Sequence, residues 1–223
     1  MDKRTALVFG ASGLVGKLLA EELSGSDRYG SVRIFVRKAT GMNVGKISET
    51  VSDLTDIASI ASLIRGDDLF ICLGTTIKKA GSVAGMEKTD RDLPVKIAST
   101  AFSNGIRNIA VVSSLGASSS SSNYYLRIKG EMEEGIINSG IENVSILRPS
   151  MLLGERKEKR AGEIAGKVVM AIFKPLLAGK FRKYRAIDGK VVAKAMVSLI
   201  LEEKGKRIIE SDVLQQIGSS HRG

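Results

Sequence analysis

The 223-residue chain has one histidine, one cysteine and no long apolar run. The histidine, His221, lies close to the C-terminal end, where chains are usually loosely held. We therefore do not expect a Ser–His–Asp hydrolase, a Cys–His protease or a His-ligated metal centre, and we predict no metal site. Any general acid–base chemistry must then come from Tyr, Lys, Asp or Glu.

The lack of a second cysteine and of a long apolar segment also bears on the compartment. Cys72 alone excludes an internal disulfide framework and fits a reducing environment. No stretch reaches the ~20 apolar residues that a membrane-spanning helix needs. The opening MDKRTALVFG has an apolar run that is too short for a secretory signal. These features together predict a cytoplasmic protein.

The basic charge is concentrated in the last third of the chain. Residues 1–148 carry 18 Lys+Arg against 16 Asp+Glu, a balance of +2, whereas residues 149–223 carry 16 against 8, which is +8. Lys and Arg alternate with aromatic residues over 173–185. This basic segment is typical either of a solvated lid or of a surface that contacts nucleic acid or an anionic membrane. We favour the lid.

Short apolar runs alternate with helix-length segments along the chain. We expect strands at 5–10, 31–38, 46–54, 68–74, 107–114 and 142–150, and helices at 13–25, 55–66, 92–105, from about 124, and at 188–203. Continuous apolar strands separated by helices indicate an α/β fold with a doubly wound parallel sheet of the Rossmann type. We predict a single domain over 1–223, in which 151–186 form a small substrate lobe or lid.

A glycine-rich turn follows the first expected strand. In GASGLVG, Gly10, Gly13 and Gly16 are spaced as GxxGxxG between TALVF and the helix KLLAEEL. Such a turn needs backbone freedom, and it lets a pyrophosphate approach the N–H groups at the helix N-terminus. The turn therefore predicts dinucleotide binding.

Residues after the next strands indicate which dinucleotide binds. The second strand ends in Arg37 and Lys38, where a site specific for NAD usually has an acidic residue. We therefore predict a preference for NADP(H), with NAD(H) possible if both cations are simply solvated. Asp53 is placed either to reach the adenine amino group or to cap the next helix. Leu73 and Gly74 end the fourth strand beside the expected cofactor.

The segment after the fifth strand carries candidate chemistry. Tyr125 and Lys129 are one helical turn apart, 11 and 15 residues after Ser114. A tyrosine can give a proton to a developing alkoxide when an ammonium group nearby lowers its pKa, and a serine hydroxyl can hold the substrate oxygen. These three residues predict hydride transfer to or from a carbonyl.

The motifs GASGLVG, VVSSLGA and YLRIK resemble the short-chain dehydrogenase/reductase superfamily. CLGTT, TDRD, SSNYYLRIKGEME and LRPSMLLGERKEKRAGE extend this resemblance to the atypical, NmrA-like Tat-interacting-protein oxidoreductase branch, over residues 5 to about 200. The resemblance implies Tyr125 as proton donor, Lys129 as its partner and nicotinamide-ribose ligand, and Ser114 as substrate-orienting hydroxyl. It implies cofactor contacts from Ser12, Gly13, Leu14, Val15, Arg37, Lys38, Leu73, Gly74, Leu152 and Arg160.

Several alternatives stay open. The spacing from Ser114 to Tyr125 is short for the superfamily, so Ser113 could take its role. Asp90 and Asp92 are expected to cap the helix that begins near Leu93. The chain is then an NADP(H)-dependent oxidoreductase acting on a small carbonyl or hydroxyl compound. Because the branch includes regulators, the alternative is an NADPH-sensing protein that binds a protein partner with little or no turnover.

Overall fold

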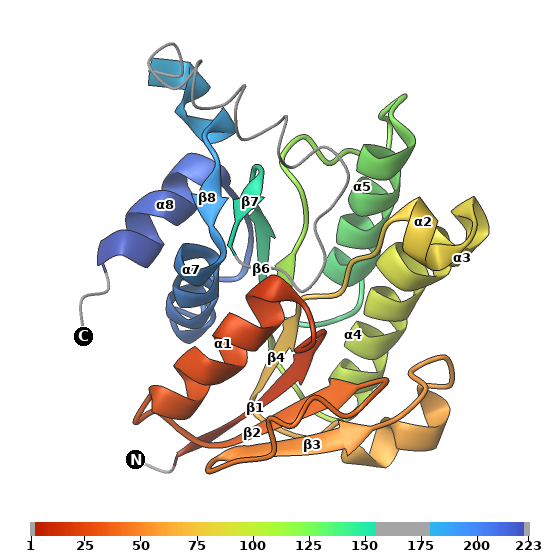
Figure 1. Cartoon of the computed structure of the whole chain (residues 1–223), viewed down its shortest axis with the longest axis vertical. Helices are drawn as coiled ribbons and strands as arrows, with labels where there is room; N and C mark the ends of the chain where they lie inside the picture. Colours follow the sequence, from red (N-terminus) through yellow and green to blue (C-terminus); the bar gives the residue numbers. More distant parts are fainter. Residues whose placement is uncertain (1–2, 155–178, 221–223) are drawn as a thin grey trace.

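The computed structural model describes residues 3–154 and 179–220, which build a seven-stranded sheet with helices on both faces (Figure 1). The strands are all parallel, in the order β3-β2-β1-β4-β5-β6-β9. In chain order they are β1 Arg4–Phe9, β2 Tyr29–Val36, β3 Ile47–Val51, β4 Asp68–Ile71, β5 Asn108–Val112, β6 Asn143–Arg148 and β9 Lys206–Glu210. The predicted doubly wound α/β fold is confirmed.

The helices form two layers, because the central strands β1, β4, β5 and β6 are buried on both faces and each face must be covered. Figure 1 shows α1 (Leu14–Gly25), α7 (Gly189–Leu201) and α8 (Ser211–Ser220) on one face of the sheet. The other face carries the 3₁₀ helix η1 (Ala58–Leu63), α4 (Leu93–Ser103) and α5 (Tyr124–Ile137). Two separate apolar cores result, one under each helical layer.

The strand order reverses between β1 and β4. The chain runs outward from β1 through β2 to β3, and then returns to place β4 on the other side of β1. After β1 the chain enters α1 on one face of the sheet, and after β4 it leads to α4 on the other face. The two connections therefore run in opposite directions from the carboxyl ends of β1 and β4. In open α/β sheets a crevice at this place is where ligands bind.

A buried polar network closes the opposite end of the sheet. The Asp68 carboxylate accepts hydrogen bonds from Arg4 Nε at 2.7 Å, Tyr29 Oη at 2.7 Å and Asn108 Nδ2 at 3.1 Å. Its side chain is wholly buried, so these donors replace the water that a carboxylate would otherwise need. The network ties β1, β2, β4 and β5 together at their amino ends.

Short elements connect the main layers. Helix α2 (Ile77–Ala80) and helix α3 (Val83–Glu87) follow β4, and a π-helical turn, η2 (Lys88–Asp92), joins α3 to α4. Later in the chain, β7 (Leu152–Leu153) pairs with β8 (Ile187–Asp188), and the 3₁₀ helix η3 spans Gly179–Tyr184. Of the expected lobe at 151–186, residues 155–178 lie outside the described residues.

Three sequence-based expectations differ from this structure. The segment 55–66 forms only the 3₁₀ helix η1, and β9 and α8 were not predicted. The side chains of Asp90 and Asp92 were predicted to cap the helix at Leu93, and this was wrong. The π-helical turn joins α4 to the preceding helix, so α4 has no free N-terminus there, and Asp90 is buried instead. Among the described helices none is both long and apolar enough to span a bilayer.

Candidate functional site

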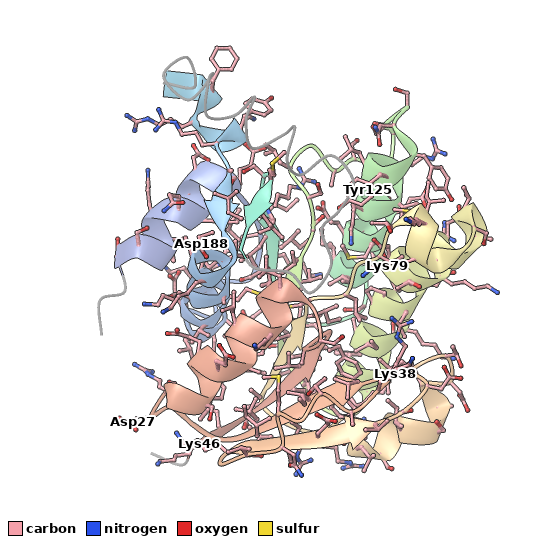
Figure 2. The ribbon with its side chains drawn as sticks, in the orientation of Figure 1. Asp27, Lys38, Lys46, Lys79, Tyr125 and Asp188 are labelled. Atoms are coloured by element: carbon pink, nitrogen blue, oxygen red, sulfur yellow. The ribbon has the colours of Figure 1, made fainter. Side chains whose placement is uncertain are left out.

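A cleft of about 810 Å³ opens above the carboxyl ends of β1, β4 and β5. Figure 2 shows Tyr125 of α5 and Lys79 of α2 on one side and Asp188 of β8 on the other. Nine of the residues predicted from the sequence line this cleft: Ser12, Gly13, Leu14, Val15, Leu73, Gly74, Tyr125, Lys129 and Leu152. Segments far apart in the chain therefore meet at the place where the strand order reverses.

The glycine turn has the geometry that its spacing predicted. Gly10 has φ +91°, and a Cβ atom there would lie 2.6 Å from the Cys72 carbonyl oxygen of the neighbouring strand. A Cβ atom at Gly16 would lie 2.2 Å from the Gly10 carbonyl oxygen. Gly10 and Gly16 do not line the cleft; they let the turn and α1 pack closely.

The N-terminus of α1 faces the cleft and suits an anion. Its N-cap, Gly13, has no side chain to cap the first turn, and the residues from Ser12 to Val15 line the cleft. Backbone N–H groups and the helix dipole favour a phosphate at such a position. The cleft also contains Lys17, Lys79 and Lys190, whose charges add to this effect. The turn and its surroundings thus fit a dinucleotide pyrophosphate.

Helix α5 carries Tyr125 and Lys129 into the same cleft. Asn123 caps the helix by accepting a hydrogen bond from the Leu126 N–H at 3.1 Å. Tyr124 does not line the cleft: its ring lies beside the Arg127 guanidinium, 5.2 Å from centroid to Cζ. Burial and the nearby carboxylate of Glu87 raise the pKa of Tyr124 to about 12. The two adjacent tyrosines therefore have different surroundings.

Among the residues whose side chains the structure describes, Lys129 is the only buried lysine or arginine, with 3% of its surface exposed. Its Nζ atom lies 3.3 Å from Oδ2 of Asp90, which is completely buried. The other carboxylate oxygen, Oδ1, accepts a hydrogen bond from the Thr75 N–H at 2.8 Å. No spacing in the sequence indicates this contact, because Asp90 and Lys129 are distant in the chain and belong to different helices.

The two serines after β5 point to different places. Ser113 lines the cleft, whereas Ser114 is half-buried outside the lining. The Ser113 hydroxyl donates to Glu133, a buried carboxylate that also accepts from Arg148 Nε at 2.9 Å. Because an arginine-paired carboxylate only accepts, the proton of this contact belongs to Ser113. The Ser113 oxygen therefore has only lone pairs left for the cleft.

The residues predicted to select the cofactor lie outside the cleft lining. Arg37 and Lys38 are exposed just after β2 ends at Val36, one strand over from the glycine turn. Asp53 is also exposed and accepts a hydrogen bond from Thr55 Oγ1 at 2.8 Å. It does not cap η1, which has no side-chain cap.

The chain returns over the cleft after β6. Leu152 and Gly154 line it from β7 and its end, and Asp188 lines it from β8, where its side chain caps α7 by accepting from the Lys190 N–H at 2.7 Å. Arg160, predicted to reach phosphate, lies outside the described residues. Sequence analysis missed the lining residues Lys17, Leu18, Glu21, Lys79, Val112, Gly154, Asp188 and Lys190. Only Asp188 had a visible signal, as a capping residue before an apolar helix.

Comparison with protein families shows which family the sequence of this cleft and glycine turn matches. The family model described as NAD(P)H-binding matches residues 10–203, from the glycine turn to the end of α7. The chain belongs to this NAD(P)H-binding family. Its cofactor class is therefore a nicotinamide dinucleotide, whereas the family does not separate NADP(H) from NAD(H).

Relatives of this NAD(P)H-binding protein agree with the branch predicted from its motifs. Protein HTATIP2 of Rattus norvegicus is 34% identical over 167 residues, which cover 73% of this chain and 69% of that protein. Protein FMP52, mitochondrial, of Candida glabrata is 34% identical over 226 positions, covering 99% and 94%. The predicted resemblance to the atypical short-chain dehydrogenase/reductases is confirmed.

Solved structures agree with the fold of the family. WbmG of Bordetella bronchiseptica in complex with NAD superposes with a TM-score of 0.69 at 13% identity, covering 98% of this chain and 77% of that one. MoeE5 in complex with UDP-glucose and NAD gives 0.69 at 14% identity, covering 97% and 81%. At such identities the likeness shows the fold alone.

The predicted cytoplasmic location is contradicted by these relatives. The FMP52 proteins of Candida glabrata, Eremothecium gossypii and Saccharomyces cerevisiae are all named mitochondrial. The prediction was wrong because a single cysteine and a short apolar N-terminal run exclude disulfide-rich secreted proteins, and they do not distinguish one reducing compartment from another.

Proposed function

We propose that this NAD(P)H-binding protein is an NADP(H)-dependent oxidoreductase that acts on a small carbonyl or hydroxyl compound. The observation that carries the proposal is that Tyr125 and Lys129 line the same cleft as the glycine turn. A phosphate-binding helix end and a proton donor thus share one cavity, which is what hydride transfer to a carbonyl requires.

The cofactor would lie across the ends of the strands. Residues Ser12 to Val15 would hold the pyrophosphate, with Leu73 and Gly74 beside it, and Leu152 would cover the nicotinamide end. The bound dinucleotide supplies or accepts the hydride. Lys129 would bind the nicotinamide ribose, and the Tyr125 hydroxyl would give a proton to the substrate oxygen, or take one in the reverse direction.

A serine hydroxyl would orient the substrate. Ser114 is the family's residue by motif, whereas Ser113 lines the cleft with its proton donated to Glu133. Alanine substitutions at the two positions separate them: loss of turnover in Ser114→Ala alone supports Ser114, and loss in Ser113→Ala alone supports Ser113.

We further propose that Arg37 and Lys38 select NADP(H) over NAD(H). Both cations are exposed at the end of β2, next to the strand that leads into the glycine turn. Two positive charges there would attract the 2′-phosphate of NADP(H). The ratio of the Kd values for NADH and NADPH tests this. A ratio well above one that falls in the Arg37→Ala/Lys38→Ala variant supports the proposal, and equal affinities in the unchanged protein contradict it.

The decisive experiment for the reaction is Tyr125→Phe, which removes one oxygen atom. We expect NADPH consumption with a panel of small aldehydes and ketones to fall about 100-fold or more, since general acid catalysis contributes roughly 10²–10⁴-fold. The affinity for NADPH should change little. Tyr124→Phe is the matched control, because Tyr124 faces Arg127 rather than the cleft, and it should keep full activity. Turnover that survives Tyr125→Phe would refute the mechanism.

The second candidate is an NADPH-sensing protein with little or no turnover. The pairing of Lys129 with Asp90 favours it, because the carboxylate offsets the positive charge that would otherwise act on the tyrosine. Such a protein binds NADPH, leaves it unconsumed with every carbonyl of the panel, and changes its affinity for a protein partner when NADPH is bound. NADPH consumption that depends on Tyr125 would exclude this candidate.

Residues 151–186 are proposed to form a lobe over the substrate rather than a surface for nucleic acid or membrane. Within the described part, Lys183 Nζ lies 2.9 Å from Glu210 Oε2, so this cation is already paired. Weak retention on nucleic acid or anionic vesicles at low salt, with an affinity that changes little as salt rises, would fit a solvated basic face. Tight retention at low salt, with an affinity that falls steeply as salt rises, would instead indicate phosphate contacts.

A further inference from the structure

The π-helical turn η2 points a carboxylate into the protein instead of into solvent. Asp90 lies in the middle of Lys88–Asp92 and is completely buried, whereas the side chain of Asp92 in the same turn is 52% exposed. A π turn inserts one extra residue into a helix and is frequent at functional sites. Here it joins α3 to α4 and brings Asp90 next to α5.

The carboxylate of Asp90 contacts two residues that line the cleft. Oδ1 fixes the Thr75 N–H at 2.8 Å, and Oδ2 lies 3.3 Å from Lys129 Nζ. Within the described residues Oδ2 accepts no hydrogen bond of good geometry, so its contact with Lys129 is an ion pair only. Asp90 itself does not line the cleft.

Gly74 leaves space beside this ion pair. A Cβ atom at Gly74 would lie 3.8 Å from Asp90 Oδ2 and 3.9 Å from Lys129 Nζ, so the backbone of Gly74 borders both groups. The Lys129 ammonium is thus confined between a buried carboxylate, a strand end and the cleft. A buried lysine with a long, flexible stem needs such a partner to keep one position.

We propose that Asp90 is a positioning residue that holds the Lys129 ammonium at the nicotinamide-ribose end of the cleft and, through Thr75, fixes the end of β4 beside it. The inference rests on the proposed role of Lys129 toward the cofactor. Asp90 acts through Lys129 and Thr75, without touching the cofactor or the substrate.

Asp90→Asn tests the proposal, because it keeps the size of the side chain and an oxygen acceptor for the Thr75 N–H. It removes the charge that faces Lys129. The probes are NADPH and adenosine 2′,5′-bisphosphate, which lacks the nicotinamide ribose. We expect the Kd for NADPH to rise about 10- to 100-fold, as for the loss of one hydrogen bond to a charged group, with the Kd for the bisphosphate changed less than about twofold.

A merely structural role gives a different result. If Asp90 only stabilises the fold, Asp90→Asn weakens both probes alike or neither, and either outcome overturns the proposal. Asp92→Asn is the matched control, because Asp92 lies in the same turn and, among the described residues, pairs only with Arg91 at the surface. It should bind both probes as the unchanged protein does.

Lys129→Met separates this inference from the proposed function. NADPH affinity that is unchanged in Lys129→Met refutes the role of Lys129 itself. If Lys129→Met weakens NADPH binding and Asp90→Asn does not, only the role of Asp90 fails. Should Asp90→Asn alone not fold, the double variant Asp90→Asn/Lys129→Met removes both buried charges. It should bind NADPH as weakly as Lys129→Met and no weaker, and a further loss overturns the proposal.

Discussion

The roles of single side chains in this NAD(P)H-binding protein depend on their immediate surroundings. Tyr124 and Tyr125 are neighbours on α5, yet one faces an arginine and the other lines the cleft. Ser113 and Ser114 differ in the same way. Residue type and order therefore narrow the candidates, and the direction in which each side chain points decides among them.

Cys72 allows a test of this dependence at one residue. Cys72 lines the cleft, and its Sγ atom lies 3.8 Å from Met196 Sδ. Burial raises the pKa of its thiol to about 12. The reactive thiolate is therefore scarce below pH 12. At pH 8 we expect iodoacetamide to label Cys72 about 50-fold more slowly than an ordinary exposed thiol with pKa ≈ 8.5, because the greater nucleophilicity of a more basic thiolate offsets part of the loss in thiolate.

The rate at which iodoacetamide labels Cys72 should increase with pH. The labelling rate should keep rising as the pH increases past 9, instead of levelling off near the pKa of an ordinary thiol. Because the chain has one cysteine, mass spectrometry reads this single site, and the protein unfolded in urea supplies the fast reference. Native labelling at the rate of the unfolded protein would contradict the assigned environment.

At the scale of elements, close packing of the loop before α5 positions the helix that carries Tyr125 and Lys129. The serine-rich loop 118–122 lies close against α5: a Cβ atom at Gly130 would lie 2.1 Å from the Ser119 nitrogen. The Ser118 N–H also donates to the Leu126 carbonyl at 3.1 Å. This loop therefore supports α5.

Gly130→Ala should disturb this support. The added methyl group would overlap the backbone of Ser118 and Ser119, and such overpacking costs about 1–3 kcal/mol of unfolding free energy. The control is Gly25→Ala at the end of α1, where a Cβ atom meets nothing within 4 Å. Urea unfolding should show a loss for Gly130→Ala and no loss for Gly25→Ala. Equal stability of the two variants would show that the loop is not held by this contact.

At the scale of the whole molecule, one end of the sheet contributes to stability and the other carries the candidate binding site. The Asp68 network joins the strands at their amino ends, and the cleft lies at their carboxyl ends. Between them lie the two apolar cores. Stability and ligand binding should therefore respond separately to substitutions at the two ends, since distant sites without shared partners add independently.

Asp68→Asn with and without NADPH tests this separation. Breaking a buried charge pair costs about 3 kcal/mol or more, which lowers Tm by roughly 6–12 °C for a chain of this size. NADPH at 100 times its Kd should stabilise both proteins by about 2.7 kcal/mol and raise both Tm values by roughly 5–10 °C. Differential scanning calorimetry measures both changes. A much smaller NADPH shift in Asp68→Asn would show that the two ends are coupled.

The sequence by itself determined the parallel sheet, the glycine turn and the Tyr125–Lys129 pair. These features depend on local spacing: apolar runs the length of a strand, glycines where a side chain would collide with the backbone, and two residues one helical turn apart. The helix at 55–66 was overestimated because its apolar spacing does not show that only a 3₁₀ turn forms. Strand β9 was missed because KRIIE is short and charged, and it gains its place by pairing with β6.

Only the tertiary structure decided which candidates meet. Asp90 contacts Lys129 across 39 positions of chain because a π turn and the packing of η2 on α5 bring them together. Ser113 lines the cleft because Glu133 of α5 and Arg148 of β6 orient its hydroxyl. Such contacts join side chains that are far apart in the sequence, so neither spacing nor composition shows them. The local spacing of the sequence places Tyr125 and Lys129 on α5, and the packing of η2 on α5 brings the Asp90 carboxylate beside Lys129.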